Sequence, residues 1–198
     1  MFDLISNLRK EWKIFYVASY FHYVQCKIQY LNEELIAKKV KGNELKKRIA
    51  EIIEAHNIAI KFAEQLEDIS NILVFVLYSV NTIILCFLFF EFNILSEDML
   101  NFFKVLVFFG VVQMLLFLFS YFGTNLEDQS KLIEDLIYDL PWYEMEDQSD
   151  ARSLILCILR AQRPCLITAA KFYPLNFESY LTAVKSAYSF CTVLKDII

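Results

Sequence analysis

The sequence contains little glycine and little proline, with three of each among 198 residues. Both residue types interrupt regular structure, so their scarcity allows long uninterrupted helices. The chain has no glycine-rich phosphate loop, no Gly-x-Ser-x-Gly elbow, no His-Glu-x-x-His pair and no paired carboxylates at a catalytic spacing. We therefore expect no enzyme, no cofactor and no bound nucleic acid.

Cysteine and histidine residues are few and scattered. The five cysteines include no Cys-x-x-Cys pair, which argues against both a zinc site and a disulfide framework. They are Cys26, Cys86, Cys157, Cys165 and Cys191. His22 stands in an aromatic stretch and His56 on the apolar face of a predicted helix, and neither is expected to have a carboxylate or cysteine at ligand distance. We predict two packed structural histidines and no metal site.

Apolar residues are in excess, and charged residues are grouped. Apolar types make up 57% of the chain and aromatic types 16%, against roughly 45–50% apolar in an average soluble domain. The net charge of −5 is ordinary, but the charges form blocks that separate long apolar runs. This arrangement is typical of membrane spans joined by loops.

Two apolar runs are long enough to cross a bilayer. Ile69 to Phe90 and Val105 to Leu126 each contain 22 residues without a formal charge. At about 1.5 Å per residue, such a helix covers a hydrocarbon core of roughly 30 Å. A shorter run, Ile14 to Cys26, has 13 residues between Lys13 and Lys27. It can cross when the two lysine side chains extend to the interfaces.

Basic residues are unevenly distributed around these spans. Eight lie between Lys27 and Lys61, whereas Lys104 is the one basic residue of the 91–104 connection. Positive charge marks the cytoplasmic side of membrane spans. We therefore expect the connection between the two long spans to be extracellular and the blocks on either side of the pair to be cytoplasmic.

Both cytoplasmic blocks are expected to contain amphipathic helices. Gly42-Asn43 gives a break with Asn43 as an N-cap, after which apolar residues recur every three or four positions from Leu45 to Leu66. A second such helix is expected after Pro141, with an interruption at Pro164. These helices predict a packed cytoplasmic anchor region.

The segment after Pro174 contains four charged residues and is too polar for a lipid-exposed span. On a helical wheel, small hydroxyl residues and two branched apolar residues share one narrow face. These are Ser179, Thr182, Ser186, Ser189, Val193 and Ile197. Such a stripe predicts a pore-lining helix with wet walls and a hydrophobic gate. Periodicity alone favours the alternative, an ordinary span whose hydroxyls bond back to the helix.

Two blocks of the sequence resemble the insect odorant receptor family. The first is Tyr121-Phe122-Gly123-Thr124-Asn125-Leu126 with the following Asp128-Gln129-Ser130, similar to the family's sixth span and the cytoplasmic stretch after it. The second contains Gln162-Arg163-Pro164, Thr168-Ala169-Ala170, Phe172-Tyr173-Pro174-Leu175 and Lys185-Ser186-Ala187-Tyr188-Ser189-Phe190, similar to the family's split seventh helix. Together with the spans, the resemblance covers essentially the whole chain.

The resemblance implies helices four to seven of a seven-helix subunit in an odorant-gated cation channel. The implied partners are a volatile small-molecule ligand, the lipid bilayer and a shared co-receptor subunit in a hetero-tetramer. The implied location is the plasma membrane of an olfactory sensory neuron dendrite. Val193 and Ile197 match the family's hydrophobic gate, and Thr182, Ser186 and Ser189 its pore lining. Because three upstream spans of the family do not occur in the sequence, we expect a partial subunit.

The family's odorant pocket lies in the outer half of spans two to six, which implies pocket residues from the first and third spans of this chain. The candidates are Phe15, Tyr16, Ser19, Phe109 and Gln113. Asn71, Asn81 and Gln113 have a second interpretation, because buried amides in spans more often tie helices together.

The predicted fold is all-α, a multi-span membrane helical bundle with cytoplasmic amphipathic anchor helices and a split last helix. Its expected parts are a first span at 1–36, a cytoplasmic helix at 37–68, a second span at 69–92, an extracellular connection at 93–104, a third span at 105–126, a cytoplasmic anchor region at 127–170 and a pore-lining last span at 171–198. Two other functions stay open, a gustatory receptor-like channel subunit and a small helical membrane scaffold without ligand or pore.

Overall fold

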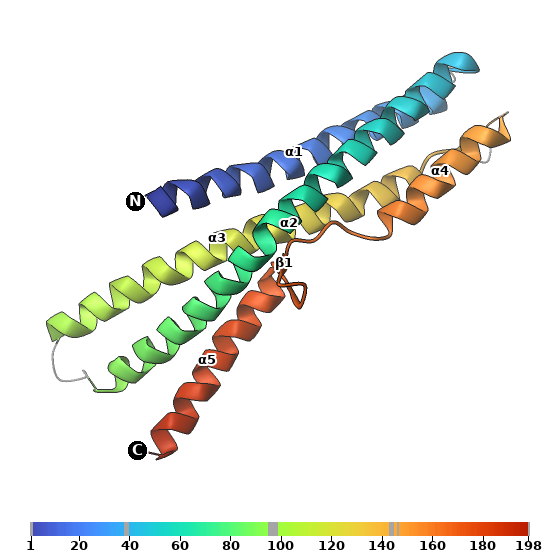
Figure 1. Cartoon of the computed structure of the whole chain (residues 1–198). Coiled ribbons are helices and arrows are strands. Elements are labelled where there is room, and N and C mark those ends of the chain that lie inside the picture. The colour runs from blue at the N-terminus through green and yellow to red at the C-terminus, as the bar shows by residue number, and fades with distance from the viewer. Residues whose placement is uncertain (1, 38–39, 95–98, 143–144, 146, 198) are drawn as a thin grey trace. The chain divides into compact units, whose positions relative to one another are not determined.

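The computed structural model describes residues 2–37, 40–94, 99–142, 145 and 147–197. Five helices and one small hairpin follow one another along this part of the chain (Figure 1). They are α1 (Phe2–Ile36), α2 (Asn43–Ile94), α3 (Met99–Tyr138), α4 (Gln148–Ala161), β1 (Thr168–Ala169), β2 (Tyr173–Pro174) and α5 (Phe177–Ile197). The predicted all-α class is confirmed.

Glycine and proline mark the junctions between helices. Gly42 adopts a φ of +60° in the turn between α1 and α2, a conformation that costs glycine little. Its carbonyl accepts the Lys46 N–H at 3.1 Å, so Gly42 takes the capping position expected for Asn43, which is the first residue of α2. Pro141 and Pro164 follow the ends of α3 and α4, because proline cannot continue a helix.

Helices α1, α2 and α3 are longer than the apolar runs within them, at 35, 52 and 40 residues. The predicted cytoplasmic helix 37–68 and second span 69–92 form the one continuous helix α2, which contains neither glycine nor proline. In the same way, α3 continues from the predicted third span into the anchor region. A change from apolar to charged side chains alters what a helix contacts but leaves its backbone hydrogen bonds intact.

The chain divides into two compact units, each built from segments far apart in the sequence. The first unit contains Met1–Leu66 and Asn125–Leu166, and the second contains Glu67–Thr124 and Ile167–Ile198. The first unit therefore holds α1, the beginning of α2, the end of α3, and α4. The second holds the remainder of α2 and α3 with the hairpin and α5.

The first unit has a continuous apolar core. Phe21 and Ile28 from α1, Ile133 and Ile137 from α3, and Leu154 from α4 are all 0% exposed. Side-chain contacts at the surface join α1 and α4 to α2. Lys27 Nζ of α1 lies 3.4 Å from Glu51 Oε2 of α2, and Arg160 Nη2 of α4 lies 3.0 Å from Glu64 Oε1 of α2. Exposed ion pairs contribute little free energy, so the apolar core dominates the stability of this unit.

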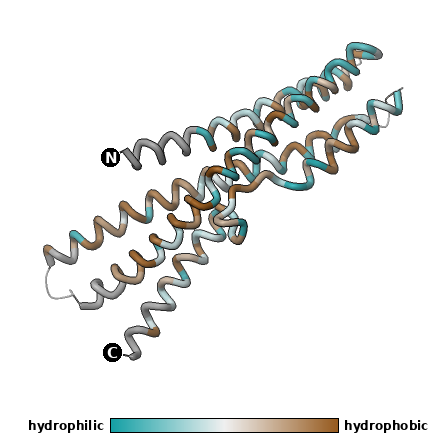
Figure 2. The backbone as a smooth tube through the Cα atoms, in the orientation of Figure 1, coloured by the Kyte–Doolittle hydropathy of each residue, from teal (hydrophilic) through white to brown (hydrophobic). Residues whose placement is uncertain are grey.

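The second unit buries a smaller core and exposes much apolar surface. Leu85, Leu116 and Ala187 are at most 2% exposed. The apolar stretches of α2 and α3 are brown in Figure 2, and many of their large apolar side chains are exposed. Two helices of the described residues are long and apolar enough to cross a membrane, and only 22% and 17% of their most apolar windows are buried. Core helices of soluble proteins are mostly buried, so these surfaces suit lipid or further protein.

Candidate pore helix and its supports

Two hydrogen bonds cap the start of α5, one to a residue just before the helix and one to a residue of α3. The Asn176 side-chain oxygen accepts the Ser179 N–H at 3.0 Å, as an N-cap residue does. The Phe177 N–H, another unpaired donor of the first turn, donates to Thr124 Oγ1 of α3 at 3.1 Å. Two donors that a helix start leaves unsatisfied are thus paired, and one of the pairs fixes α5 on α3.

Backbone contact tightens this junction. Gly123 of α3 is buried beneath Leu175, and a Cβ at Gly123 would overlap the Leu175 carbonyl oxygen. Only glycine permits so close an approach between a helix and another backbone. Gly123 and Thr124 belong to the first block of family resemblance, and their physical role is to hold the beginning of α5 against α3.

The hairpin before α5 was not predicted from the sequence. Thr168 pairs with Pro174 and Ala169 with Tyr173, and the Leu175 N–H donates to the Ile167 carbonyl at 2.7 Å. Strands of two residues are too short to give an alternating pattern. The turn also lacks glycine, although Ala170 and Lys171 adopt φ of +49° and +64°. Left-handed conformations at non-glycine residues cost roughly 1 kcal/mol each, so surrounding contacts must hold them.

Those surrounding contacts come from α2. The Ala170 N–H donates to the Asn71 carbonyl at 3.1 Å, and Thr168 Oγ1 donates to Glu67 Oε1 at 2.8 Å. Both acceptors lie within one and a half turns of α2. The hairpin is therefore fastened to α2 at one end, while Leu175 and Phe177 after it are fastened to α3.

One face of α5 packs against α3 through aromatic and polar contacts. The Phe117 ring lies 5.2 Å from the Phe177 ring and 6.2 Å from the Tyr180 ring, measured between centroids. Tyr180 Oη donates to Gln113 Oε1 at 3.3 Å, and Gln113 Nε2 donates to Asn81 Oδ1 of α2 at 3.4 Å. The amide of Gln113 thus connects α5, α3 and α2. We name this chain of three side chains the amide–phenol relay.

The opposite face of α5 carries the predicted hydroxyl stripe and is open. Val193 is 57% exposed, and Thr182 and Ser189 are also exposed. A shallow groove of about 370 Å³ runs along this face. It is lined by Thr182, Lys185, Ser186, Ser189 and Val193. The structure adds Lys185, which lies beside Ser189 at the edge of the stripe on the wheel, whereas the Ile197 side chain lies outside the described residues.

Hydroxyls of α5 also bond back to the helix, as the alternative interpretation expects. Thr182 Oγ1 donates to the Glu178 carbonyl at 2.9 Å, and Thr192 Oγ1 donates to the Ser189 carbonyl at 2.8 Å. Such bonds leave the hydroxyl oxygen able to accept from water. Back-bonding is therefore compatible with a wet groove, and it does not require the stripe to pack in a core.

The five candidates for an odorant pocket are divided between the two units. Phe15 and Tyr16 of α1 are 50% and 61% exposed, and Ser19 Oγ donates to the Phe15 carbonyl at 2.8 Å. In the second unit, Phe109 is half-buried and Gln113 is 9% exposed. Because both ends of the Gln113 amide are engaged in the relay, the structure favours its interpretation as a helix-tying residue.

Each histidine has a cysteine neighbour, which corrects the expectation from sequence. His56 Nδ1 of α2 lies 3.2 Å from Cys157 Sγ of α4, and both residues are buried. Burial, with a smaller effect of the Arg160 charge, lowers the pKa of His56 to about 4, and burial raises the pKa of Cys157 to about 11. The pair is therefore neutral. His22 and Cys26 form the second pair, and both are exposed, so His22 is not a packed core residue.

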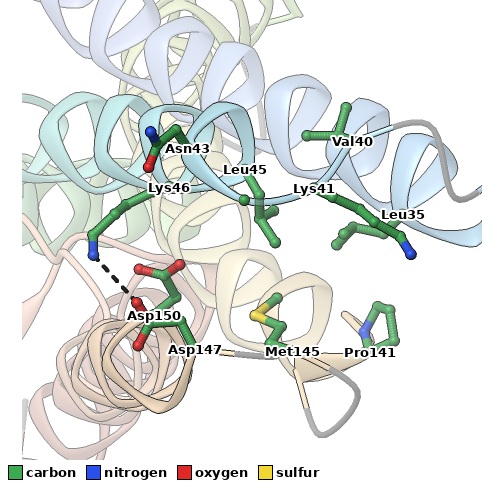
Figure 3. A pocket seen from close by; sticks show the side chains of 11 residues that line it. Leu35, Val40, Lys41, Asn43, Leu45, Lys46, Pro141, Met145, Asp147 and Asp150 are labelled. Carbon is green, nitrogen blue, oxygen red and sulfur yellow. Dashed lines mark hydrogen bonds and ion pairs between the residues drawn. The ribbon is translucent and has the colours of Figure 1, made fainter.

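A pocket of about 510 Å³ lies in the first unit between the α1–α2 turn and the start of α4 (Figure 3). At one end of it, Lys46 Nζ lies 3.3 Å from Asp147 Oδ2. Asp147 also caps α4, and hydrogen bonds from Ser149, its backbone N–H first, with the nearby Lys46, lower the pKa of the Asp147 carboxyl. This pocket belongs to the predicted cytoplasmic region and not to the outer half of the spans.

Comparisons with known proteins match most of this chain. A family model described as 7tm Odorant receptor matches residues 15–188. Odorant receptor 10 of Aedes albopictus is 27% identical over 150 residues, covering 76% of this chain and 40% of that receptor. Odorant receptor 13a of Drosophila melanogaster is 25% identical over 197 residues, covering 93% of this chain and 46% of that receptor. The chain thus spans about half the length of these relatives.

A solved structure shares the fold. The olfactory receptor OR5 of Machilis hrabei, determined in complex with eugenol, superposes with a TM-score of 0.71 at 16% identity, covering 93% of this chain and 46% of that one. The family is one of membrane receptors and not of enzymes, in agreement with the apolar surfaces of α2 and α3. On the match to residues 15–188, this chain belongs to the insect odorant receptor family.

Proposed function

We propose that the chain supplies the C-terminal helices of an odorant-gated cation channel subunit, in which α5 lines the pore. A volatile small molecule is the ligand, and it opens the channel by binding the open state more tightly than the closed one. The subunit acts in the plasma membrane of a sensory neuron dendrite, in a hetero-tetramer with a shared co-receptor. Family membership supports this proposal.

The observation that carries the proposal is the difference between the two faces of α5. One face is fixed on α3 by Tyr180, Phe177 and the Thr124 contact, whereas the other presents hydroxyls and Val193 in an open groove. A helix held on one side with a wet, uncovered stripe on the other is suited to surround a water-filled axis with symmetry-related copies. An ordinary core helix would cover that stripe.

Val193 is the proposed gate residue together with Ile197 one turn later. Branched apolar side chains at the narrow end of a pore exclude water and ions by dewetting when they approach one another. Val193 is 57% exposed, so its side chain is free to face other copies. Thr182, Ser186 and Ser189 precede it along the groove and would stay hydrated.

For the ligand, the proposal takes candidate residues from α1 in the first unit and from α3 in the second unit, each considered by itself. Phe15 and Tyr16 expose half or more of their surface, and Ser19 adds a hydroxyl to the same helix. Aromatic surface with an occasional polar group is typical of pockets for small apolar ligands. Phe109 is the candidate from α3. Gln113 lies one turn further along α3 and connects it to α5 through the amide–phenol relay.

The division into units supports the proposed membrane topology. The unit boundaries at 66/67 and 124/125 lie within two residues of the predicted membrane boundaries at 68/69 and 126/127. Beyond them, the first unit carries the salt bridges Lys46–Asp147 and Arg160–Glu64, which suit an aqueous environment. We assign the part of this unit formed by 37–66 and 127–166 to a cytoplasmic anchor.

The test is odorant-evoked cation current in cells that express this chain with any upstream coding sequence, with and without the co-receptor. Val193→Ala is compared with Val184→Ala, which makes the same change in size. Val184 lies nine residues earlier, about half a turn around the helix from Val193. We expect Val193→Ala to raise the current without odorant several-fold and Val184→Ala to leave it near that of the wild type.

Two results would count against the proposal. A surface-expressed protein that leaves co-receptor currents unchanged indicates a scaffold without ligand or pore. The second result is a working channel that carries equal currents in the wild type, Val193→Ala and Val184→Ala. That result indicates that this stripe of α5 does not line the ion pathway.

A further inference from the structure

His22 and Cys26 form an exposed imidazole–thiol pair on α1. They lie four residues apart, which places their side chains on one face of the helix one turn from each other. His22 Nε2 lies 3.9 Å from Cys26 Sγ, and both residues are exposed. Nothing in the proposed channel function uses this pair.

Two hydrogen bonds of Gln25, one to His22 and one to α3, fix the tautomer of His22. The buried Gln25 donates from Nε2 to the Gln129 carbonyl at 2.8 Å, and a carbonyl can only accept. The amide is thereby oriented with Oε1 toward His22 Nδ1, at 3.3 Å. Because Oε1 also can only accept, Nδ1 must carry the proton. The unprotonated Nε2 lone pair of the neutral ring is therefore the one directed at Cys26.

We propose that His22 Nε2 and Cys26 Sγ bind a soft divalent metal ion, for which Zn²⁺ is the natural representative. On binding, the thiol releases its proton to solvent, a metal–sulfur bond forms, and the imidazole nitrogen donates its lone pair. Tetrahedral Zn²⁺ with bonds of about 2.1 Å to nitrogen and 2.3 Å to sulfur separates the two atoms by about 3.6 Å. A small side-chain rotation closes the observed separation to that value.

The Gln25 amide acts as the outer support that metal-bound histidines usually have. Metal-ligating histidine donates its other N–H to a carbonyl or carboxylate, which holds the ring and the tautomer. Here that acceptor is Gln25 Oε1, itself fixed by the Gln129 carbonyl of α3. Within the described ranges, no cluster of three metal-ligating side chains occurs, so water or an external ligand completes the coordination. The site is thus open.

Charged surface adjoins the pair and gives ions access to it. Lys27 follows Cys26 directly, and its Nζ lies 3.4 Å from Glu51 Oε2 of α2. Both side chains of this ion pair are partly exposed, at 31% and 42%. His22 and Cys26 therefore lie at the polar end of the apolar run in α1, where water and ions reach them.

The second histidine–cysteine pair of the chain provides a contrast. His56 and Cys157 are closer, at 3.2 Å, but both are buried in the first unit. Forming a thiolate there is costly, as the pKa of Cys157 raised to about 11 by burial indicates. An ion would also have to lose its hydration with no route from solvent. We therefore expect metal at the exposed pair only.

The experiment titrates Cd²⁺, a spectroscopic substitute for Zn²⁺, into the reduced full chain in lipid nanodiscs. The readout is the thiolate-to-cadmium charge-transfer absorption in the ultraviolet, followed by displacement with Zn²⁺. We expect a saturable band that Cys26→Ser removes and that His22→Ala shifts to roughly tenfold higher Cd²⁺ or more. Gln25→Leu is expected to weaken binding by about 10- to 100-fold through loss of the outer support.

Cys157→Ala is the matched control because it removes the cysteine of the buried pair. The proposal requires that this variant keep the wild-type band and midpoint. A band that survives Cys26→Ser, or one that Cys157→Ala removes, overturns the proposal, as does the absence of any saturable band in the wild type. No current is measured, so these outcomes are independent of the channel function proposed above.

Discussion

Two glycines of α3 have opposite surroundings. Gly123 lies beneath Leu175, where a Cβ would overlap backbone atoms, whereas nothing lies within 4 Å of a Cβ built at Gly110. Backbone cannot move aside as the end of a flexible side chain can. The missing Cβ at Gly123 therefore allows Leu175 to approach α3 closely. This close approach positions the start of α5.

The substitution Gly123→Ala is expected to destabilise the protein, because the added methyl group forces Leu175 away from α3. Overpacking of this kind costs about 1–3 kcal/mol. Gly110→Ala is the control, since its methyl meets open space and alanine favours helix by up to about 1 kcal/mol over glycine. Thermal unfolding of the two variants in detergent or nanodiscs measures the difference. A Gly123→Ala variant as stable as Gly110→Ala would show that the close approach is not required.

Single residues also show where sequence reasoning was incomplete. His22 and Cys26 lie four positions apart in a helix, so their contact could have been predicted from spacing alone. His56 and Cys157 are separated by 101 positions, and no local pattern brings them together. Their contact depends on how α4 packs against α2, which a single sequence does not reveal.

At the scale of helices and strands, the breaks marked by glycine or proline were easier to predict than the ends inferred from side-chain polarity. Gly42, Pro141 and Pro174 lie next to the starts or ends of helices, because each restricts the backbone locally. The predicted ends at residues 68 and 126 marked a change in side-chain polarity, across which α2 and α3 continue. The hairpin escaped prediction because its strands have two residues each and its turn has no glycine.

The attachment of α5 rests on contacts that sequence patterns did not specify. Helical periodicity predicted which residues share the open face of α5. It could not predict the amide–phenol relay, because Tyr180, Gln113 and Asn81 come from three different helices. Polar contacts between spans contribute about 0.6 kcal/mol on average and up to about 1.7 kcal/mol. Contacts of this size can shift a gating equilibrium severalfold without unfolding the protein.

In the proposed channel, Tyr180→Phe is expected to change the ratio of closed to open states by a factor of about three. The substitution removes the hydroxyl that bonds Gln113 but keeps the ring against Phe117. Concentration–response curves and currents without odorant measure the change. The double variant Tyr180→Phe with Gln113→Leu should differ from wild type no more than Gln113→Leu alone, since Gln113→Leu already removes the Tyr180–Gln113 bond.

Tyr121→Phe is the control for this prediction. Tyr121 is 48% exposed, contacts Phe177 through its ring, and has no side-chain hydrogen bond within the described part of the chain. Loss of its hydroxyl should leave the curves unchanged. Additive effects of Tyr180→Phe and Gln113→Leu would instead show that the two residues are not energetically coupled. The amide–phenol relay would then have no role in the proposed gating.

For the whole molecule, the distribution of charge and of exposed apolar surface supports the proposed orientation in the membrane. Basic residues are concentrated between Lys27 and Lys61, and the 91–104 connection has only Lys104. The apolar windows of α2 and α3 between these regions are largely unburied. A bilayer around those windows satisfies both the positive-inside tendency and the need to cover apolar surface.

This orientation predicts which parts of the chain face outward in intact cells. A cysteine introduced by Ser96→Cys, chosen from the sequence of the connection, should react with a membrane-impermeant thiol reagent applied outside. A cysteine introduced by Gln148→Cys, at the exposed start of α4, should react only after the membrane is permeabilised. Labelling is compared with the parent chain, because Cys26 is itself exposed. Labelling of Gln148→Cys from outside, with Ser96→Cys labelled only after permeabilisation, would reverse the orientation of α2 and α3. It would place the proposed cytoplasmic anchor outside the cell and contradict the proposed topology.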